Sequence, residues 1–311
     1  MPAELVDLNK EFELGNKFTL YTCEALANML DNSFRVIVKY QGQDLPEYND
    51  DKKNIVICTS KEVHSIPIEF YRDDVLIVFQ HYFMLDKWGY PIHNPAMTPL
   101  PLGTFIDIDI NEQEIIPIPE RKYDFCFMGQ IPHTGKRDSF HRNLNKVLQE
   151  CKDKYKSFIK ITDGFGQGLT QEEYLSILGN SKLCLCPQGA ISDETFRFFE
   201  SIAMGAIPVV EHLPKLWYYE CAPYMKTRSW NELDTTIAMS LNFMQTPDSR
   251  PLFHNIADYV TNILMPDALA VRLKRIIEYR IETQDQNQSG LINLRKMLKD
   301  EYEDAVSIKY V

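Results

Sequence analysis

The chain has 311 residues, 44% of them hydrophobic and 25% charged, which is typical of a globular protein with one large domain or two smaller ones. Its net charge of −11 argues against a general nucleic-acid-binding protein, because such proteins bind by neutralising phosphates. The sequence offers no run of about 18 consecutive apolar residues, so we expect no membrane span. Seven cysteines without a pairing pattern suggest free thiols in a reducing compartment.

The first third of the chain alternates helical and strand patterns. The spacing predicts a short helix at 24–30 and buried, β-branched strands at 34–40, 54–59 and 75–79. A proline-rich segment follows at 91–103. Because proline at this density breaks both helices and strand pairing, we interpret that segment as a linker.

The alternation resumes after residue 120. Strands are predicted at 123–128, 157–162, 182–187 and 206–211, and helices at 141–151, from Thr170 onward, at 194–204 and, as a pair, within 268–304. Such alternation indicates parallel sheets with helices on both faces. We therefore predict an α/β fold with two Rossmann-like lobes, 1–115 and 116–265, followed by C-terminal helices in 266–311. Ligands are expected in a cleft between the lobes, beyond the carboxyl ends of the strands.

The most informative segment runs from residue 181 to 211 and reads as strand, loop, helix and strand. Ser192 or Asp193 is predicted to cap the helix, whose first N–H groups would form an anion site. Arg197 and Glu200, three residues apart, share a helix face. An arginine fork there suits a diphosphate, and a glutamate one turn on suits ribose hydroxyls. The alternative is an exposed arginine–glutamate pair on the helix surface.

This segment resembles the signature of exostosin-like glycosyltransferases, family 47. The resemblance rests on residues 183–189 (LCLCPQG), 195–201 (TFRFFES) and 205–209 (GAIPV). Gln188 stands where the family usually has arginine, which removes one positive charge, whereas Thr195 in place of serine keeps a hydroxyl. A weaker similarity extends to 123–130 and into the first lobe.

The resemblance implies a two-lobed enzyme of the GT-B type that inverts the anomeric centre without a metal. It also implies a UDP-sugar donor, with xylose, another pentose or a uronic acid as the sugar, and a glycan hydroxyl as acceptor. No cofactor is expected beyond that nucleotide-sugar substrate. Because the N-terminal segment lacks the features of a signal peptide, we expect a microbial or viral enzyme that acts in the cytoplasm.

When a nucleoside diphosphate leaves, negative charge develops on its oxygens. Without a metal, cationic side chains and backbone N–H groups must stabilise that charge. The expected donor-binding residues are Gly129, Arg137, Arg142, Thr195, Arg197 and Glu200. Arg197 is the first choice for the diphosphate, and Gly129 would permit close backbone approach. The alternatives are solvated helix charges for Arg137 and Arg142, and a simple turn at Gly129.

Inversion also requires a general base for the acceptor hydroxyl. Glu62 follows the strand at 54–59, and a carboxylate just past a strand end is well placed for this role. His81, after the next strand, and His64 are the competing candidates. A lone histidine near a strand end is more often a structural residue, so Glu62 is the predicted base.

Two other groups of residues and two other functions are alternatives to this interpretation. Asp107 and Asp109 form a D-x-D pair, but in an apolar, strand-like run, and Cys184 and Cys186 favour core packing over zinc. A GDP-fucose-dependent fucosyltransferase-like enzyme is disfavoured, because that family's Glu-Lys pair falls on Thr195 and the following phenylalanine. A catalytically inactive glycan- or nucleotide-binding protein of the same fold stays open.

Overall fold

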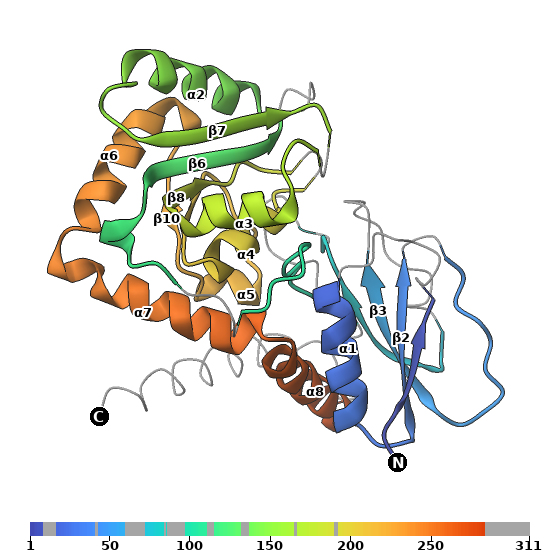
Figure 1. The fold of residues 1–311 in the computed structure, drawn as a ribbon. Helices are drawn as coiled ribbons and strands as arrows, with labels where there is room; N and C mark the ends of the chain where they lie inside the picture. Colours follow the sequence, from blue (N-terminus) through green and yellow to red (C-terminus); the bar gives the residue numbers. More distant parts are fainter. Residues whose placement is uncertain are drawn as a thin grey trace. The chain divides into compact units, whose positions relative to one another are not determined.

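The computed structural model describes residues 1–8, 17–40, 43–59, 72–83, 85, 97–110, 115–131, 137–164, 167–189 and 192–283. The chain divides into two compact units. Unit 1 comprises Met1–Gly103, Pro214–Glu220 and Asn262–Val311, and unit 2 comprises Thr104–Leu213 and Cys221–Thr261. Each unit contains a five-stranded parallel sheet with helices packed on it (Figure 1). The predicted α/β class with two lobes is therefore confirmed.

The sheet of unit 1 follows the order of the chain. Its neighbouring strands are β1 (Glu4–Asp7), β2 (Phe34–Tyr40), β3 (Lys53–Thr59), β4 (Val75–Gln80) and β5 (Met97–Pro99), all paired in parallel. The strands predicted at 34–40, 54–59 and 75–79 are confirmed to within one residue at each end. The short β1 had no counterpart among the predicted strands.

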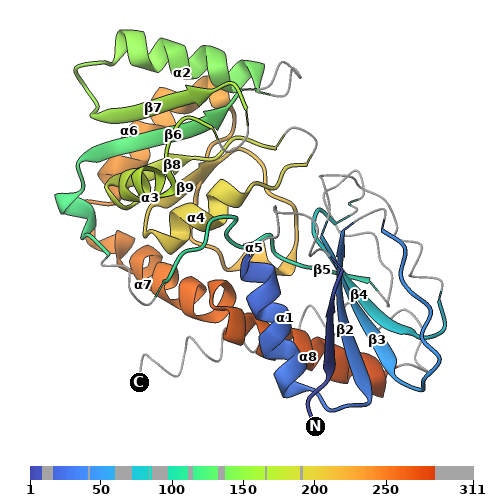
Figure 2. The ribbon, with the colours of Figure 1, turned by 45° about the vertical axis from the view of Figure 1, so that its right-hand side comes forward.

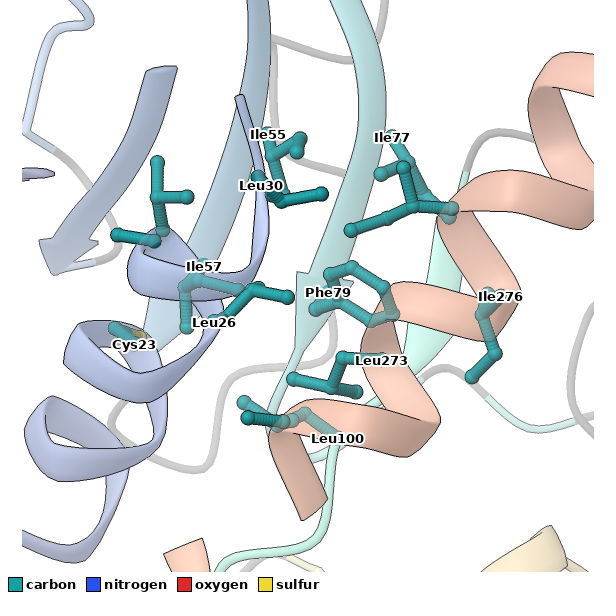
Figure 3. Close-up of a cluster of buried hydrophobic side chains, with 14 of the residues drawn as sticks. Cys23, Leu26, Leu30, Ile55, Ile57, Ile77, Phe79, Leu100, Leu273 and Ile276 are labelled. Carbon is teal, nitrogen blue, oxygen red and sulfur yellow. The ribbon is translucent and has the colours of Figure 1, made fainter. Parts of the chain in front are cut away.

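Two helices cover one face of this sheet, although most of the chain separates them. They are α1 (Lys17–Met29) and α8 (Pro266–Glu282), and their apolar side chains meet those of the strands in one buried cluster (Figure 3). In that cluster Leu26 of α1 and Leu273 of α8 lie over Ile57 and Phe79 of the strands. The helix predicted at 24–30 is the second half of α1. Of the two helices predicted in 268–304, the first lies in α8, and residues 284–304 lie outside the described part of the chain.

The proline-rich segment is not only a linker. Residues 91–96 lie outside the described part of the chain, but β5 pairs in parallel with β4 through Met97–Pro99. Proline lacks an N–H donor and is tolerated on an edge strand, and β5 is an edge strand. The indole of Trp217, in the short helix α5 (Trp217–Glu220), donates to the Pro99 carbonyl over 3.1 Å. The boundary with unit 2 follows at Gly103.

The sheet of unit 2 does not follow the order of the chain. The strands are β6 (Tyr123–Gln130), β7 (Ser157–Thr162), β8 (Ser181–Leu185), β9 (Ile207–Val210) and β10 (Met225–Lys226), and their order is β10-β9-β8-β6-β7. All pairings are parallel. The chain runs from β6 to the edge strand β7 on one side and then returns to β8 on the other side of β6. The four strands predicted in this region are confirmed, whereas β10 was not predicted.

Helices cover both faces of the unit 2 sheet (Figure 2). On one face, α2 (Asp138–Glu150) and α6 (Leu233–Phe243) enclose an apolar core with the side chains of alternate strand residues and Trp230. On the other face lie α3 (Gln171–Gly179) and α4 (Phe196–Ala203), and α7 (Arg250–Tyr259) contacts α4. The predicted capping box opens α3, with Thr170 and Glu173 bonded reciprocally.

The remaining short elements connect these layers. They are the 3₁₀ turns Ile118–Glu120, Trp230–Glu232 and Pro247–Ser249 and a π-helical turn at Val260–Leu264. The seven cysteines all lie in the described part of the chain and form no disulfide. Within the described residues, every helix is too short or too polar to cross a bilayer.

Candidate functional site

The topology of unit 2 singles out one edge of its sheet. In a parallel α/β sheet, ligands bind outside the carboxyl ends of the strands, at the point where the strand order reverses. Here the reversal lies between β6 and β8, which pair with each other while their sequence neighbours β7 and β9 lie on opposite sides. The ends of these two strands, at Gln130 and Leu185, therefore locate the candidate site.

Arg197, in the first turn of α4, reaches this strand end. Its Nε donates to the carbonyl of Met128 over 2.9 Å, and its guanidinium carbon lies 4.9 Å from the ring centroid of Phe127. Its Nη1 is buried and has no hydrogen-bond partner in the described part of the chain. Burial lowers the pKa of Arg197, but the surrounding polar groups, Tyr174 first, outweigh it and leave the pKa above its ordinary value. A charged group with an unused donor thus lies at the switch point.

Gly129 makes room for this guanidinium. Its φ of 152° lies in a region that favours glycine. A Cβ atom at this position would lie 2.1 Å from Nη2 of Arg197, which is shorter than any real contact of that kind. In the structure the close approach that the glycine permits is therefore made by Arg197 itself. Gly129 is consequently more than a simple strand-to-loop turn.

Glu200 is not part of an exposed ion pair. The residue is only 4% exposed, and its Oε1 accepts from the backbone N–H groups of Phe105 (3.2 Å) and Ile106 (3.4 Å). Its Oε2 accepts from the hydroxyl of Tyr174 over 2.7 Å. Burial raises the pKa of Glu200, while the Tyr174 hydroxyl and the positive charge of Arg197 act against that rise. The alternative of an exposed arginine–glutamate pair is wrong for Glu200.

The start of α4 differs from the prediction. The helix begins at Phe196 with Thr195 as its N-cap residue, and the Thr195 side chain makes no capping hydrogen bond. Ser192 instead accepts from the N–H of Glu194 in the turn before the helix, over 3.1 Å. The predicted caps, Ser192 and Asp193, are therefore wrong, because the turn at these residues comes before the helix, which begins at Phe196. The Thr195 hydroxyl is left unused by the cap at the same end of the helix as Arg197.

The two arginines of the β6–α2 region differ from each other. Arg137 is 7% exposed, and its guanidinium donates to the carbonyls of Gln130 and Gln188. It therefore joins the last residue of β6 to the segment that follows β8, and it is not a solvated helix charge. Arg142 lies on the exposed side of α2, and within the described residues no hydrogen bond or ion pair holds it. The structure thus brings Arg137, but not Arg142, into contact with the strand ends.

The candidate bases belong to unit 1. Glu62 and His64 lie outside the described part of the chain. His81 follows β4 and is 2% exposed, with its Nε2 lying 3.4 Å from the hydroxyl of Thr19 on α1. Burial lowers the pKa of His81 to about 3, despite a hydrogen bond to the backbone of Pro101. A histidine so enclosed and so weakly basic favours a structural role.

The aspartate pair and the cysteines belong to no metal-ligating cluster within the described residues. Asp107 and Asp109 lie in an irregular segment, although the run around them has a strand-like sequence. The carbonyl of Asp107 accepts from the Gln171 side chain over 2.8 Å, which ties that segment to α3. Cys184 and Cys186 are buried on one face of the sheet, as expected. No group of three metal-ligating side chains occurs among the residues that the structure describes.

Sequence reasoning missed the groups that hold Glu200. Tyr174 comes from α3, and Phe105 comes from the segment just after the unit boundary. The ring of Phe105 also packs on Phe196, the first residue of α4, with centroids 5.4 Å apart. The capping box at Thr170 places Tyr174 in the first turn of its helix, but spacing alone does not reveal its partner.

Comparison with known families gives one match. The Exostosin GT47 domain matches residues 30–225, which is more than half of the chain and includes the strands β6, β8 and β9 and the helix α4. All of the expected donor-binding residues and all three candidate bases fall inside the matched range.

Solved structures give weaker likenesses. An α1,3-fucosyltransferase is 11% identical, with a TM-score of 0.44, over 89% of this chain and 90% of that one. MnaA of S. aureus in a co-structure with UDP is 11% identical, with a TM-score of 0.42, over 91% and 97%. A DNA-modifying β-glucosyltransferase is 10% identical, with a TM-score of 0.42, over 89% and 100%. Likeness at this level identifies neither a substrate nor a residue.

Proposed function

The chain belongs to the exostosin GT47 family of glycosyltransferases, and from that premise we propose that it transfers a sugar from a UDP-sugar to a glycan hydroxyl with inversion and without a metal. The proposed sugars are xylose, another pentose or a uronic acid. The donor-binding residues are Arg197, Glu200, Thr195, Gly129 and Arg137, with Arg142 as an outer positive charge, and Glu62 is the base.

The proposed nucleotide-sugar site depends on one observation, the N–H group of Arg197 that has no hydrogen-bond partner in the part of the chain that the structure describes. A buried donor that lacks a partner costs about 1–3 kcal/mol, and native proteins retain few of them. Within the described residues Nη1 of Arg197 is such a donor, at the edge where parallel sheets bind ligands. A diphosphate oxygen would satisfy it and would bring charge that the guanidinium stabilises. The first N–H groups of α4, at the same position, would add to that stabilisation.

Gln188 lacks the positive charge of the family's usual arginine, and Arg137 supplies a positive charge close to it. The Arg137 guanidinium donates to the Gln188 carbonyl, so a fixed positive charge lies beside the residue that lacks the family's arginine. Arg137 is held there by a second carbonyl, that of Gln130. The charge is therefore pre-organised, and this supports an active enzyme over a binding protein without catalysis.

The proposed reaction is a single displacement. The acceptor oxygen attacks the anomeric carbon as the bond to the diphosphate oxygen breaks, and the acceptor proton passes to Glu62. Charge develops on the departing diphosphate, where Arg197 and Arg137 would stabilise it. No step in this scheme requires a metal.

The deciding experiment measures nucleotide release from a panel of UDP- and GDP-sugars with glycan acceptors. The proposal expects release of UDP, a product of inverted anomeric configuration by NMR, and full activity in excess EDTA. Release of GDP alone would show that the donor is a GDP-sugar and not a UDP-sugar. Loss of activity in EDTA with rescue by manganese would show that the enzyme requires a metal. Absence of release with every donor would favour the inactive binding protein.

A further inference from the structure

Tyr174 lies next to the proposed ribose-binding carboxylate. Its hydroxyl donates to Oε2 of Glu200 over 2.7 Å, and this bond joins α3 to α4. The capping box formed by Thr170 and Glu173 fixes the first turn of α3, from which the tyrosine projects. Burial raises the pKa of Tyr174 well above its ordinary value, so its hydroxyl keeps its proton and acts as a donor toward the carboxylate.

The two oxygens of Glu200 are used unequally. A carboxylate offers about four acceptor positions, two on each oxygen. Oε1 accepts from both Phe105 and Ile106, so its two positions are filled. Among the residues that the structure describes, Oε2 accepts from Tyr174 alone, which leaves one position beside the tyrosine oxygen. The tyrosine oxygen also retains its own acceptor capacity.

We propose that Tyr174 is a positioning and specificity-determining residue of the donor site, which orients Glu200 so that Oε2 and the tyrosine oxygen together receive the ribose hydroxyls of the nucleotide. The inference rests on the proposed function, since it assigns the ribose of the donor to Glu200. In this arrangement Tyr174 and Glu200 together bind the ribose hydroxyls. A nucleotide without one of those hydroxyls leaves the buried oxygens short of a donor, and such a deficit is strongly selective.

The test compares nucleotides that differ only in the ribose. Calorimetric titration of the full chain with UDP, 2′-deoxy-UDP and 3′-deoxy-UDP gives a ribo-to-deoxy affinity ratio for the wild type and for Tyr174→Phe. We expect the wild type to prefer UDP by about tenfold or more over at least one deoxy analogue, as for a hydrogen bond to a charged group. In Tyr174→Phe the ratio should approach one, because UDP affinity falls while affinity for that deoxy analogue changes little.

A matched control exists in the same unit. The hydroxyl of Tyr155 donates to the carboxylate of Asp234 over 2.6 Å, on the face of the sheet that α6 covers. Tyr155→Phe therefore removes the same kind of bond away from the proposed site and should keep the wild-type ratio. Thermal unfolding of both variants verifies that each is folded. If Tyr174→Phe does not fold, Glu200→Gln serves instead, because an amide retains only one acceptor oxygen and should also lower the ratio.

The outcomes separate this inference from the proposed function. A wild-type protein that transfers sugar from UDP-sugars but binds UDP and both deoxy analogues equally refutes the role of the pair and leaves the function intact. An unchanged ratio in Tyr174→Phe refutes the role of the tyrosine alone. Absence of both nucleotide binding and sugar transfer in the wild type refutes the function and the inference together.

Discussion

The two sheets of this protein have the same size and the same parallel pairing, but they differ in strand order. In unit 1 the five described strands follow the chain, so neighbours in sequence are neighbours in the sheet. In unit 2 the order reverses beside β6. A reversal separates the loops that follow two adjacent strands and leaves room for a ligand between them. The second arrangement therefore locates a ligand site from topology alone, and the first does not.

The polar groups at the strand ends differ in the same way. In unit 2, Arg197, Glu200 and Arg137 are buried or partly buried, and each is held by named partners. One N–H group of Arg197 has no partner in the described part of the chain. In unit 1, the described candidate, His81, is enclosed against α1. Donor binding can thus be argued from geometry, whereas the identity of the base has to be tested chemically.

The largest expected effect concerns that base. Glu62→Gln keeps the shape of the side chain but removes its basicity, so turnover should fall by about 10²–10⁴, the usual contribution of a positioned base. Donor affinity should barely change, because the proposed diphosphate site consists of unit 2 residues. Single-turnover rates and UDP titrations separate the two quantities.

His81→Asn is the competing variant in the same assay. Since His81 is buried, it should transfer sugar at a rate near that of the wild type, measured per folded protein. An inactive His81→Asn variant together with a fully active Glu62→Gln variant would show that His81, and not Glu62, is the base. If both variants transfer normally, the base lies on another segment.

The next effect concerns the diphosphate. Arg197→Ala should lose about 2–4 kcal/mol of transition-state stabilisation, the scale of one pre-organised donor. Arg197→Lys should recover little, because an ammonium cannot hold the Met128 carbonyl and a phosphate with the same planar fork. The ratio kcat/KM for the donor gives this quantity, and Arg250→Ala, at an exposed position on α7 in the same unit, is the control. Wild-type kinetics in Arg197→Ala would remove it from the site.

Much of this framework was readable from the sequence, for a physical reason. Buried parallel strands need continuous β-branched runs, and β2 was predicted with its observed bounds for that reason. The edge strand β7 is only partly buried, and it too was predicted with its observed bounds. The strand β1 has only four residues in an acidic segment, and β5 carries a proline, so neither showed that pattern. The elements between β9 and α8 were not assigned from the sequence at all.

The site was readable only in part. Arg197 and Glu200 lie on one short helix, so their spacing could be read directly. Their partners come from distant positions: Tyr174 is 26 residues and Phe105 is 95 residues from Glu200 along the chain. Such contacts depend on how α3 and the segment after Gly103 pack on α4, which local periodicity does not encode. The burial of His81 also depends on packing, here with α1.

A smaller effect concerns the space that Arg197 occupies. Gly129→Ala should destabilise the protein by about 1–3 kcal/mol, because the new methyl group meets Nη2 of Arg197 at an unfavourable φ. Urea unfolding measures this loss. At Gly179, a Cβ would meet only the Met204 side chain at 3.4 Å, so Gly179→Ala should be close to neutral. Part of the cost should disappear in the double variant with Arg197→Ala, and an undiminished cost would show that the guanidinium does not cause it.

The last prediction concerns His81 and the pH dependence of stability. Its pKa is about 3 in the folded protein and about 6.5 when unfolded, so between these values the unfolded chain binds more protons. The stability that this neutral histidine contributes is therefore complete above pH 6.5 and is lost progressively as the pH falls toward 3. The slope should approach about 1.4 kcal/mol per pH unit in this window, and His81→Asn should remove that part of it. Urea unfolding midpoints at pH 5, 6 and 7 give the slopes. Gly179→Ala changes no ionisable group and should keep the wild-type slope. If His81→Asn also keeps it, the histidine is not held neutral in the folded protein, and the argument for a structural rather than a catalytic role loses its main support.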